Sequence, residues 1–195
     1  MSNATNDESN VEESPEMVDG YYFVIVPRIM GSISALSSMV IIYVIFKAMT
    51  KLKSTYHRIM FGMSIGDIIA SIGMSLTHLP MPAPGINPLV DLYISPDYRI
   101  GTIQTCNIQG FMIMAGTLLN YMYNAALCWY YYFVIVKTMK DNVIAKRIEP
   151  FLHCIPILLS LSYGITLYLL RAYNPDASFC LAGKLHDKAC FFVPI

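Results

Sequence analysis

Residues 150–170 read PFLHCIPILLSLSYGITLYLL, and this stretch contains no Asp, Glu, Lys or Arg. At a rise of about 1.5 Å per residue, a helix of 21 residues reaches about 30 Å, the thickness of a bilayer's hydrocarbon core. A helix satisfies its own backbone N–H and C=O groups, so it can cross lipid where irregular chain cannot. The stretch therefore predicts a membrane-spanning helix.

Three more apolar runs precede this one, so the sequence predicts an all-α membrane protein with four transmembrane helices. The composition agrees, because 55% of the 195 residues are hydrophobic and only 13% are charged, whereas soluble domains carry about a quarter charged residues. The expected spans are residues 22–46, 59–79, 106–136 and 150–170. They form a transmembrane domain over residues 21–171, followed at residues 172–195 by a loop and the start of another apolar run.

Basic residues in the loops predict the orientation of these spans. Lys and Arg gather in the first and third loops, as Lys47, Lys51, Lys53 and Arg58, and as Lys137, Lys140, Lys146 and Arg147. Loops rich in Lys and Arg stay on the cytoplasmic side. The acidic segment 1–20, expected to be a disordered tail, and residues 172–195 then lie outside. We expect a multi-pass protein of the plasma membrane.

Asp67 is the only charged residue of the second span. A carboxylate in the membrane costs a few kcal/mol unless it faces protein or water. Helical spacing places other polar side chains near it on one face, namely Ser64, Ser71, Ser75 and His78. We expect Asp67 to be protonated or partnered by a cation such as sodium. It is either an ion or proton site that biases a conformational change, or a carboxylic acid hydrogen-bonded within the bundle.

The third span carries a polar stripe at spacings of three and four residues. Its members are Cys106, Gly110, Ile113, Thr117, Asn120, Asn124, Cys128 and Tyr131. Amide and hydroxyl groups are disfavoured in lipid, so we expect this face to point into the bundle. Thr117, Asn120 and Asn124, with Asp67, Ser71 and His78, are the candidate ligand- or ion-binding residues. Polar contacts between helices are the alternative.

The inner end of the third span contains Tyr130, Tyr131 and Tyr132, which we take as candidates for a cytoplasmic switch. Aromatic residues also gather at membrane interfaces without any such role. In the second span, Gly62 and Gly66 form a GxxxG pattern. Small residues let helix backbones approach closely, and the pattern favours packing within one bundle over a dimer interface.

Three of the five cysteines, Cys106, Cys180 and Cys190, lie on the expected outer side. An oxidising exterior permits a disulfide, and these residues leave three pairings open. The four histidines are scattered, and the sequence contains no phosphate-binding glycine loop and no HExxH motif. We therefore predict neither an enzyme nor a cofactor or metal site, and the charge pattern gives no reason to expect a nucleic-acid partner.

The order of these features resembles the first half of a seven-helix G-protein-coupled receptor. Residues 62–67, GMSIGD, are similar to the Leu-Ala-x-x-Asp motif of rhodopsin-like receptors. The opening Cys106-x-x-Gln109-Gly110-Phe111 resembles the cyclic-AMP-receptor-like branch, in which the partner cysteine follows span four. The resemblance implies a Cys106–Cys180 disulfide, with Cys190 as the next candidate.

The resemblance also implies a protein that senses an extracellular ligand and signals across the membrane, with a heterotrimeric G protein as a partner if further helices exist. Spans five to seven are missing, so we expect a fragment. Tyr131 stands where the arginine of the Asp-Arg-Tyr motif is usual, and Ser37-Ser38 where Gly-Asn is usual. The alternative is a four-span transporter subunit or membrane scaffold that uses Asp67 as an ion or proton site.

Overall fold

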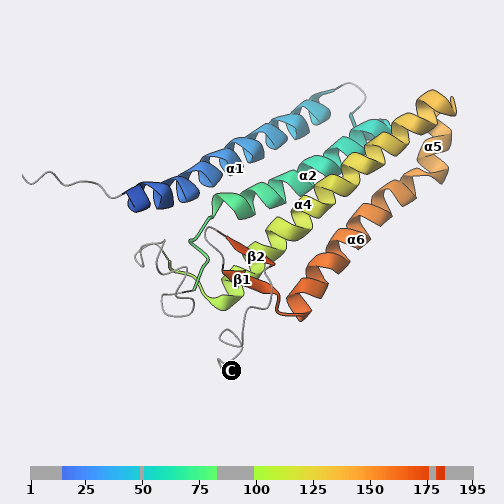
Figure 1. Ribbon diagram of the computed structural model, residues 1–195. Helices are drawn as coiled ribbons and strands as arrows, with labels where there is room; N and C mark the ends of the chain where they lie inside the picture. The colour runs from blue at the N-terminus through green and yellow to red at the C-terminus, as the bar shows by residue number, and fades with distance from the viewer. Residues whose placement is uncertain (1–14, 49–50, 83–98, 176–178, 183–195) are drawn as a thin grey trace, which may run out of the picture.

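A computed structural model describes residues 15–48, 51–82, 99–175 and 179–182 (Figure 1). The long helices are α1 (Pro15–Lys47), α2 (Thr55–Ser75), α4 (Ile103–Tyr131) and α6 (Glu149–Leu169). The shorter elements are the 3₁₀ turn η1 (Lys51–Lys53), the π-helical turn η3 (Tyr132–Val136), α5 (Asp141–Arg147), β1 (Tyr173–Pro175) and β2 (Cys180–Ala182).

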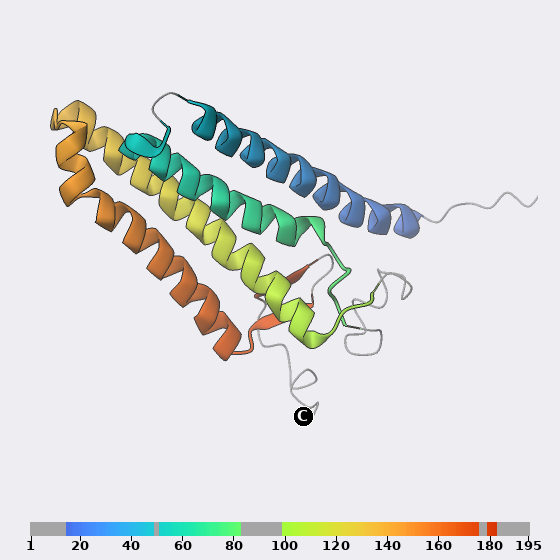
Figure 2. The same ribbon diagram turned by 180° about the vertical axis from the view of Figure 1, so that it is seen from behind.

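The four long helices lie side by side in the order α1, α2, α4, α6, as both views show (Figures 1 and 2). Successive helices run in opposite directions, so η1 and α5 are at one end of the bundle and the β-hairpin is at the other. We call these the inner and the outer end, after the orientation that the sequence predicts. The hairpin pairs β1 with β2 antiparallel and packs on α4. Helix α4 thus contacts α2, α6 and both strands of the hairpin, while α1 packs on α2.

Three helical segments are long and apolar enough to cross a membrane: Val24–Lys47, Ile103–Val136 and Glu149–Leu169. In the most apolar stretch of each segment, no more than 28% of the residues are buried. Most of the apolar side chains therefore face outward, as expected for lipid contact. Helix α2 is not among the segments that are long and apolar enough to cross a membrane. It carries Asp67 together with several Ser and Gly residues, and it lies between α1 and α4. The protein is therefore a membrane protein by its helices, with α2 as the least apolar of the four.

Glycines let α2 and α4 approach closely. A Cβ added to Gly116 would lie 2.8 Å from the backbone nitrogen of Ala70, and one added to Gly66 would lie 3.2 Å from the backbone nitrogen of Asn120. Gly62 faces the ring of Tyr123 on α4. The GxxxG pattern of the second span therefore serves packing within the bundle, as the sequence predicts.

The helix ends differ from the expected spans in three places. Helix α1 begins at Pro15, inside the segment expected to be a disordered tail, because proline suits the first helical turn. Helix α2 ends at Ser75, before residue 79, and Thr77 follows with a φ of 47°. Helix α4 begins at Ile103 because the side chains and backbone N–H groups of Thr102 and Thr105 cap each other.

Candidate functional site

Asp67 is the centre of a polar contact between three helices. Its Oδ2 accepts hydrogen bonds from Ser34 Oγ at 2.9 Å and Ser38 Oγ at 2.5 Å, both on α1. Its Oδ1 accepts one from Asn120 Nδ2 on α4 at 3.2 Å. The carboxylate is only partly buried, and α1, α2 and α4 meet at it. We call Asp67, Ser34, Ser38 and Asn120 the Asp67 cluster.

The partners of Asp67 in the described part of the chain are all neutral. Hydroxyl and amide donors orient the charge without cancelling it. The cluster can therefore hold a negative charge in one place, and it leaves that charge available to a cation.

Sequence reasoning found only part of this cluster. Asn120 was a candidate and does contact Asp67, whereas Ser34 and Ser38 were not. The two serines are one helical turn apart, so the i, i+4 spacing of polar residues in an apolar span was the signal that could have identified them.

The other candidate residues are not members of the Asp67 cluster. Ser64, Ser71 and His78 are buried, and Thr117 is half-buried. The hydroxyl of Ser75 donates to the carbonyl of Ile72 in its own helix.

The expected polar face of the third span does not stay inside the bundle along its whole length. Cys106, Gly110 and Ile113 are buried, but Asn124, Cys128 and Tyr131 are exposed. Asn124 follows Cys106 by 18 residues, which are five turns of 3.6 residues, so both lie on the same side of a straight helix. The exposure of the inner members of the stripe therefore means that the inner half of α4 packs on its neighbours through a different face. The inward positions of the inner half are instead Tyr123, Ala126 and Tyr130, which are buried.

The inner end of the bundle contains a second polar contact, centred on Glu149 at the start of α6. Arg58 on α2 forms an ion pair with Glu149, and its Nη2 lies 2.5 Å from Oε2. The hydroxyl of Thr55 donates to the same oxygen at 3.0 Å. His153 Nε2 lies 3.7 Å from Oε1, while its Nδ1 lies 3.1 Å from the hydroxyl of Tyr123 on α4. This Glu149 network connects α2, α4 and α6.

The tyrosines proposed as a switch are split between core and surface. Tyr130 is buried in a cluster with Ile59 and Ile144, and its hydroxyl donates to Asp141 Oδ1 at 3.4 Å. Tyr131 and Tyr132 are exposed. Tyr130 therefore connects α4 to the first residue of α5.

The outer end is tied by the Cys106–Cys180 disulfide, which confirms the predicted pairing, with Cα atoms 5.4 Å apart. Cys190 lies outside the described residues. Beside the disulfide, Gln109 is 1% exposed. Its Nε2 donates to the carbonyls of Gly73, at 3.0 Å, and Thr77, at 2.5 Å, and its Oε1 accepts from the backbone N–H of Cys180 at 3.3 Å. Gln109 thus joins α4 to the end of α2 and to β2.

Tyr173 on β1 holds the other strand of the hairpin. Its hydroxyl donates to the carbonyl of Gly164 on α6 at 3.1 Å, and its ring lies against Gly110 on α4. Burial of this side chain, with a smaller contribution from Tyr163, raises the pKa of the Tyr173 hydroxyl to about 12. The hairpin is therefore fixed to α4 and α6, and through Gln109 to the end of α2.

Comparison with known proteins gives no match: no family model, no curated protein and no solved structure is significantly similar to this chain.

Proposed function

We propose that this chain is the first four helices of a receptor-like protein of the seven-helix type, which senses an extracellular ligand and signals across the plasma membrane. The observation that carries the proposal is the outer-end tie, in which Cys106–Cys180 fixes the hairpin after α6 to the start of α4. The resemblance to receptors implies this tie, and the geometry agrees with it. A fixed outer hairpin gives a ligand a preformed surface.

In this proposal α4 carries the signal. At its outer end Gln109 contacts α2 and β2, at mid-length Asn120 contacts Asp67, and at its inner end Tyr123 contacts His153. A ligand at the outer ends would favour one position of α4. Because the three contacts lie on a single helix, a shift at one of them changes the geometry of the others, and the Glu149 network responds at the inner end.

The proposal includes four spans with the N-terminus outside. The loops after α1 and α4 carry the basic residues, and α2 crosses the membrane shielded by α1 and α4. Cysteines placed at residues 5 and 185 should react with a membrane-impermeant maleimide on intact cells. A cytosolic location for either residue would contradict this topology.

The direct test of function uses the complete reading frame of the gene. Membranes that contain its product should raise guanine-nucleotide exchange on added heterotrimeric G proteins, and Tyr130→Phe should change that exchange at equal surface level. Tyr123→Phe, which keeps the ring but loses the contact to His153, provides a second variant on the same helix. No exchange with any G protein tested would contradict the receptor proposal.

The second candidate is a four-span transporter subunit or scaffold in which Asp67 binds an ion or proton. The neutral partners of Asp67 favour it, since they leave a negative charge for a cation. Proteoliposomes containing the chain should then show sodium or proton flux that Asp67→Asn removes. Exchange activity without flux supports the receptor, and flux without exchange supports the transporter.

A further inference from the structure

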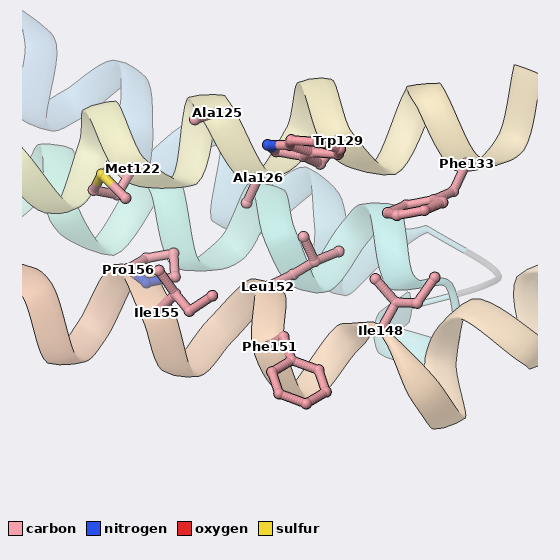
Figure 3. A pocket seen from close by; sticks show the side chains of 10 residues that line it. All are labelled: Met122, Ala125, Ala126, Trp129, Phe133, Ile148, Phe151, Leu152, Ile155 and Pro156. Carbon is pink, nitrogen blue, oxygen red and sulfur yellow. The ribbon is translucent and has the colours of Figure 1, made fainter. Parts of the chain in front are cut away.

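The inner halves of α4 and α6 enclose an apolar groove of about 280 Å³. Figure 3 shows Trp129 and Phe133 of α4 on one wall, and Phe151 and Ile155 of α6 on the other. The small side chain of Ala126 lies between the walls. We call this feature the α4/α6 groove. Its hollow form follows from the small residues of α4, which leave a gap between bulky neighbours.

The groove opens on the outside of the bundle. Trp129 is 57% exposed and Phe151 is 64% exposed, although both helices are apolar enough to cross a membrane. From Met122 to Phe133 the groove follows α4 for about 16 Å at the helical rise of about 1.5 Å per residue. This length equals roughly one leaflet of the hydrocarbon core, which is about 15 Å thick. An acyl chain of one leaflet therefore fits along it.

Cations border the inner mouth of the groove, where Phe133 and Ile148 lie (Figure 3). Lys137 follows Phe133 by one turn, and its Nζ lies 6.0 Å from the centre of the Tyr132 ring. That ring contacts both Trp129, at 5.9 Å, and Phe133, at 5.6 Å. Lys137 is therefore connected through Tyr132 to the wall of the groove.

Arg147 stands next to Ile148 in the chain and is exposed, as are Lys140 and Lys146 of the same segment. The two acidic residues nearby are engaged with the protein itself, because Asp141 accepts from Tyr130 and Glu149 pairs with Arg58. The chain segments that adjoin Phe133 and Ile148 thus carry four exposed cations, Lys137, Lys140, Lys146 and Arg147, and positive charge is in excess there.

We propose that the α4/α6 groove binds an anionic phospholipid, with one acyl chain along Trp129 and its phosphate between Lys137 and Arg147. The apolar walls account for the chain, and the cations at the mouth account for the charge of the headgroup. A second copy of the protein would bring its own basic loops to this mouth, and like charges would oppose that contact. This inference is independent of the receptor proposal.

The chain provides its own probe, because Trp129 is its only tryptophan. The full chain is reconstituted into vesicles of phosphatidylcholine. One series contains increasing fractions of brominated phosphatidylserine, and the other contains increasing fractions of brominated phosphatidylcholine. Brominated acyl chains quench tryptophan fluorescence on contact. We expect half-maximal quenching at a fraction of brominated phosphatidylserine about fivefold lower than that of brominated phosphatidylcholine, since even one cation near the surface gives a preference of this order.

Two pairs of variants separate the groove from general attraction to the membrane. The double variant Lys137→Gln with Arg147→Gln should bring the ratio of the half-maximal fractions of the two brominated lipids close to one. The double variant Lys47→Gln with Lys53→Gln removes the same amount of charge from the same end of the bundle, and it should retain the preference for phosphatidylserine. Ala125→Phe fills the groove and should lower quenching by both lipids, whereas Leu158→Phe, on the exposed face of α6 and outside the groove, should not.

Equal quenching by the two brominated lipids in the unmodified chain would overturn the proposal, and so would loss of the preference in the Lys47 and Lys53 variant. Unchanged quenching by both lipids in Ala125→Phe would show that the lipid binds elsewhere, which contradicts the proposal. If neither lipid quenches the fluorescence, protein covers Trp129, and this outcome also contradicts the proposal. Formation of the Cys106–Cys180 bond in each variant shows that the fold is retained.

Discussion

Arg58 and Glu149 form an ion pair between the first turns of α2 and α6, across 91 positions of sequence. The side chain of Arg58 is 32% exposed and that of Glu149 is 12% exposed, so water screens the pair only in part. Arg58 also donates to the carbonyl of Leu52 at 2.9 Å. The pair therefore fixes the start of α2, the turn before it and the start of α6 in one arrangement.

Replacing Glu149 with Gln should lower the free energy of unfolding by about 1–2 kcal/mol, because the guanidinium of Arg58 loses its charged partner in a partly dry site. The measurement is the thermal unfolding midpoint of the protein in detergent. The double variant Arg58→Gln with Glu149→Gln provides the control, and it should lose less than the sum of the two single variants. Additive losses would mean that the two side chains do not interact.

Asp67→Asn should leave the unfolding midpoint nearly unchanged. The amide oxygen still accepts from Asn120, and the hydroxyls of Ser34 and Ser38 can act as acceptors for the new NH₂ group. Asp67→Leu has a similar size but no acceptor, so it should cost about 2–3 kcal/mol by leaving three donors unsatisfied. Any dependence of activity on sodium or pH that arises at Asp67 should disappear in the Asn variant. Equal stability of the Asn and Leu variants would contradict this account of the cluster.

Gln109→Leu should destabilise the outer end by about 2–3 kcal/mol, because two carbonyls and one N–H lose their partner in a dry site. Hydrogen exchange should accelerate in β1 and β2 before the rest of the chain. Gln104→Leu makes the same change on an exposed position of α4 and should have little effect. Faster exchange in both variants would show that the hairpin does not depend on Gln109.

The hydroxyl of Tyr173 should remain protonated to unusually high pH, because the pKa in the folded protein is about 12, above the ordinary value near 10. The raised pKa means that the contribution of Tyr173 to stability is complete below pH 10. It is then lost as pH rises towards about 12, where the unfolded chain has already released its proton.

The phenolate absorbance of the unmodified chain minus that of Tyr173→Phe isolates this residue among the 14 tyrosines. A difference spectrum that titrates near pH 10 would show that the side chain is not buried.

Hydropathy predicted the helices well because length and apolar content are properties of one segment at a time. Residues 150–170 correspond closely to α6, and the end of the third expected span at residue 136 coincides with the end of η3. Helix α5 was not expected, since seven residues are too few for a periodic pattern to be recognised. The start of α1 at Pro15 was hidden by acidic residues that a helix tolerates in its first turns.

The site was predicted less completely because it depends on which helices are neighbours. Asp67 and Asn120 were identified as polar residues in apolar spans, but no single span shows that Ser34 and Ser38 face them. The Glu149 network was missed for a related reason. Arg58 and Glu149 lie at the ends of spans, where charged residues are expected on the surface and their presence does not indicate a site. The disulfide followed from the resemblance to receptors, not from spacing.

The Cys106–Cys180 bond has a topological consequence, since it joins residues 74 positions apart and so closes α4, α5 and α6 into a covalent ring. Residues 137–140, between η3 and α5, lie at the end of this ring opposite the bond. A protease that cuts there opens the ring without dividing the molecule. The two pieces travel as one species on a non-reducing gel and separate only when a thiol is added, so the inner loop can be cleaved while the outer end keeps its partners.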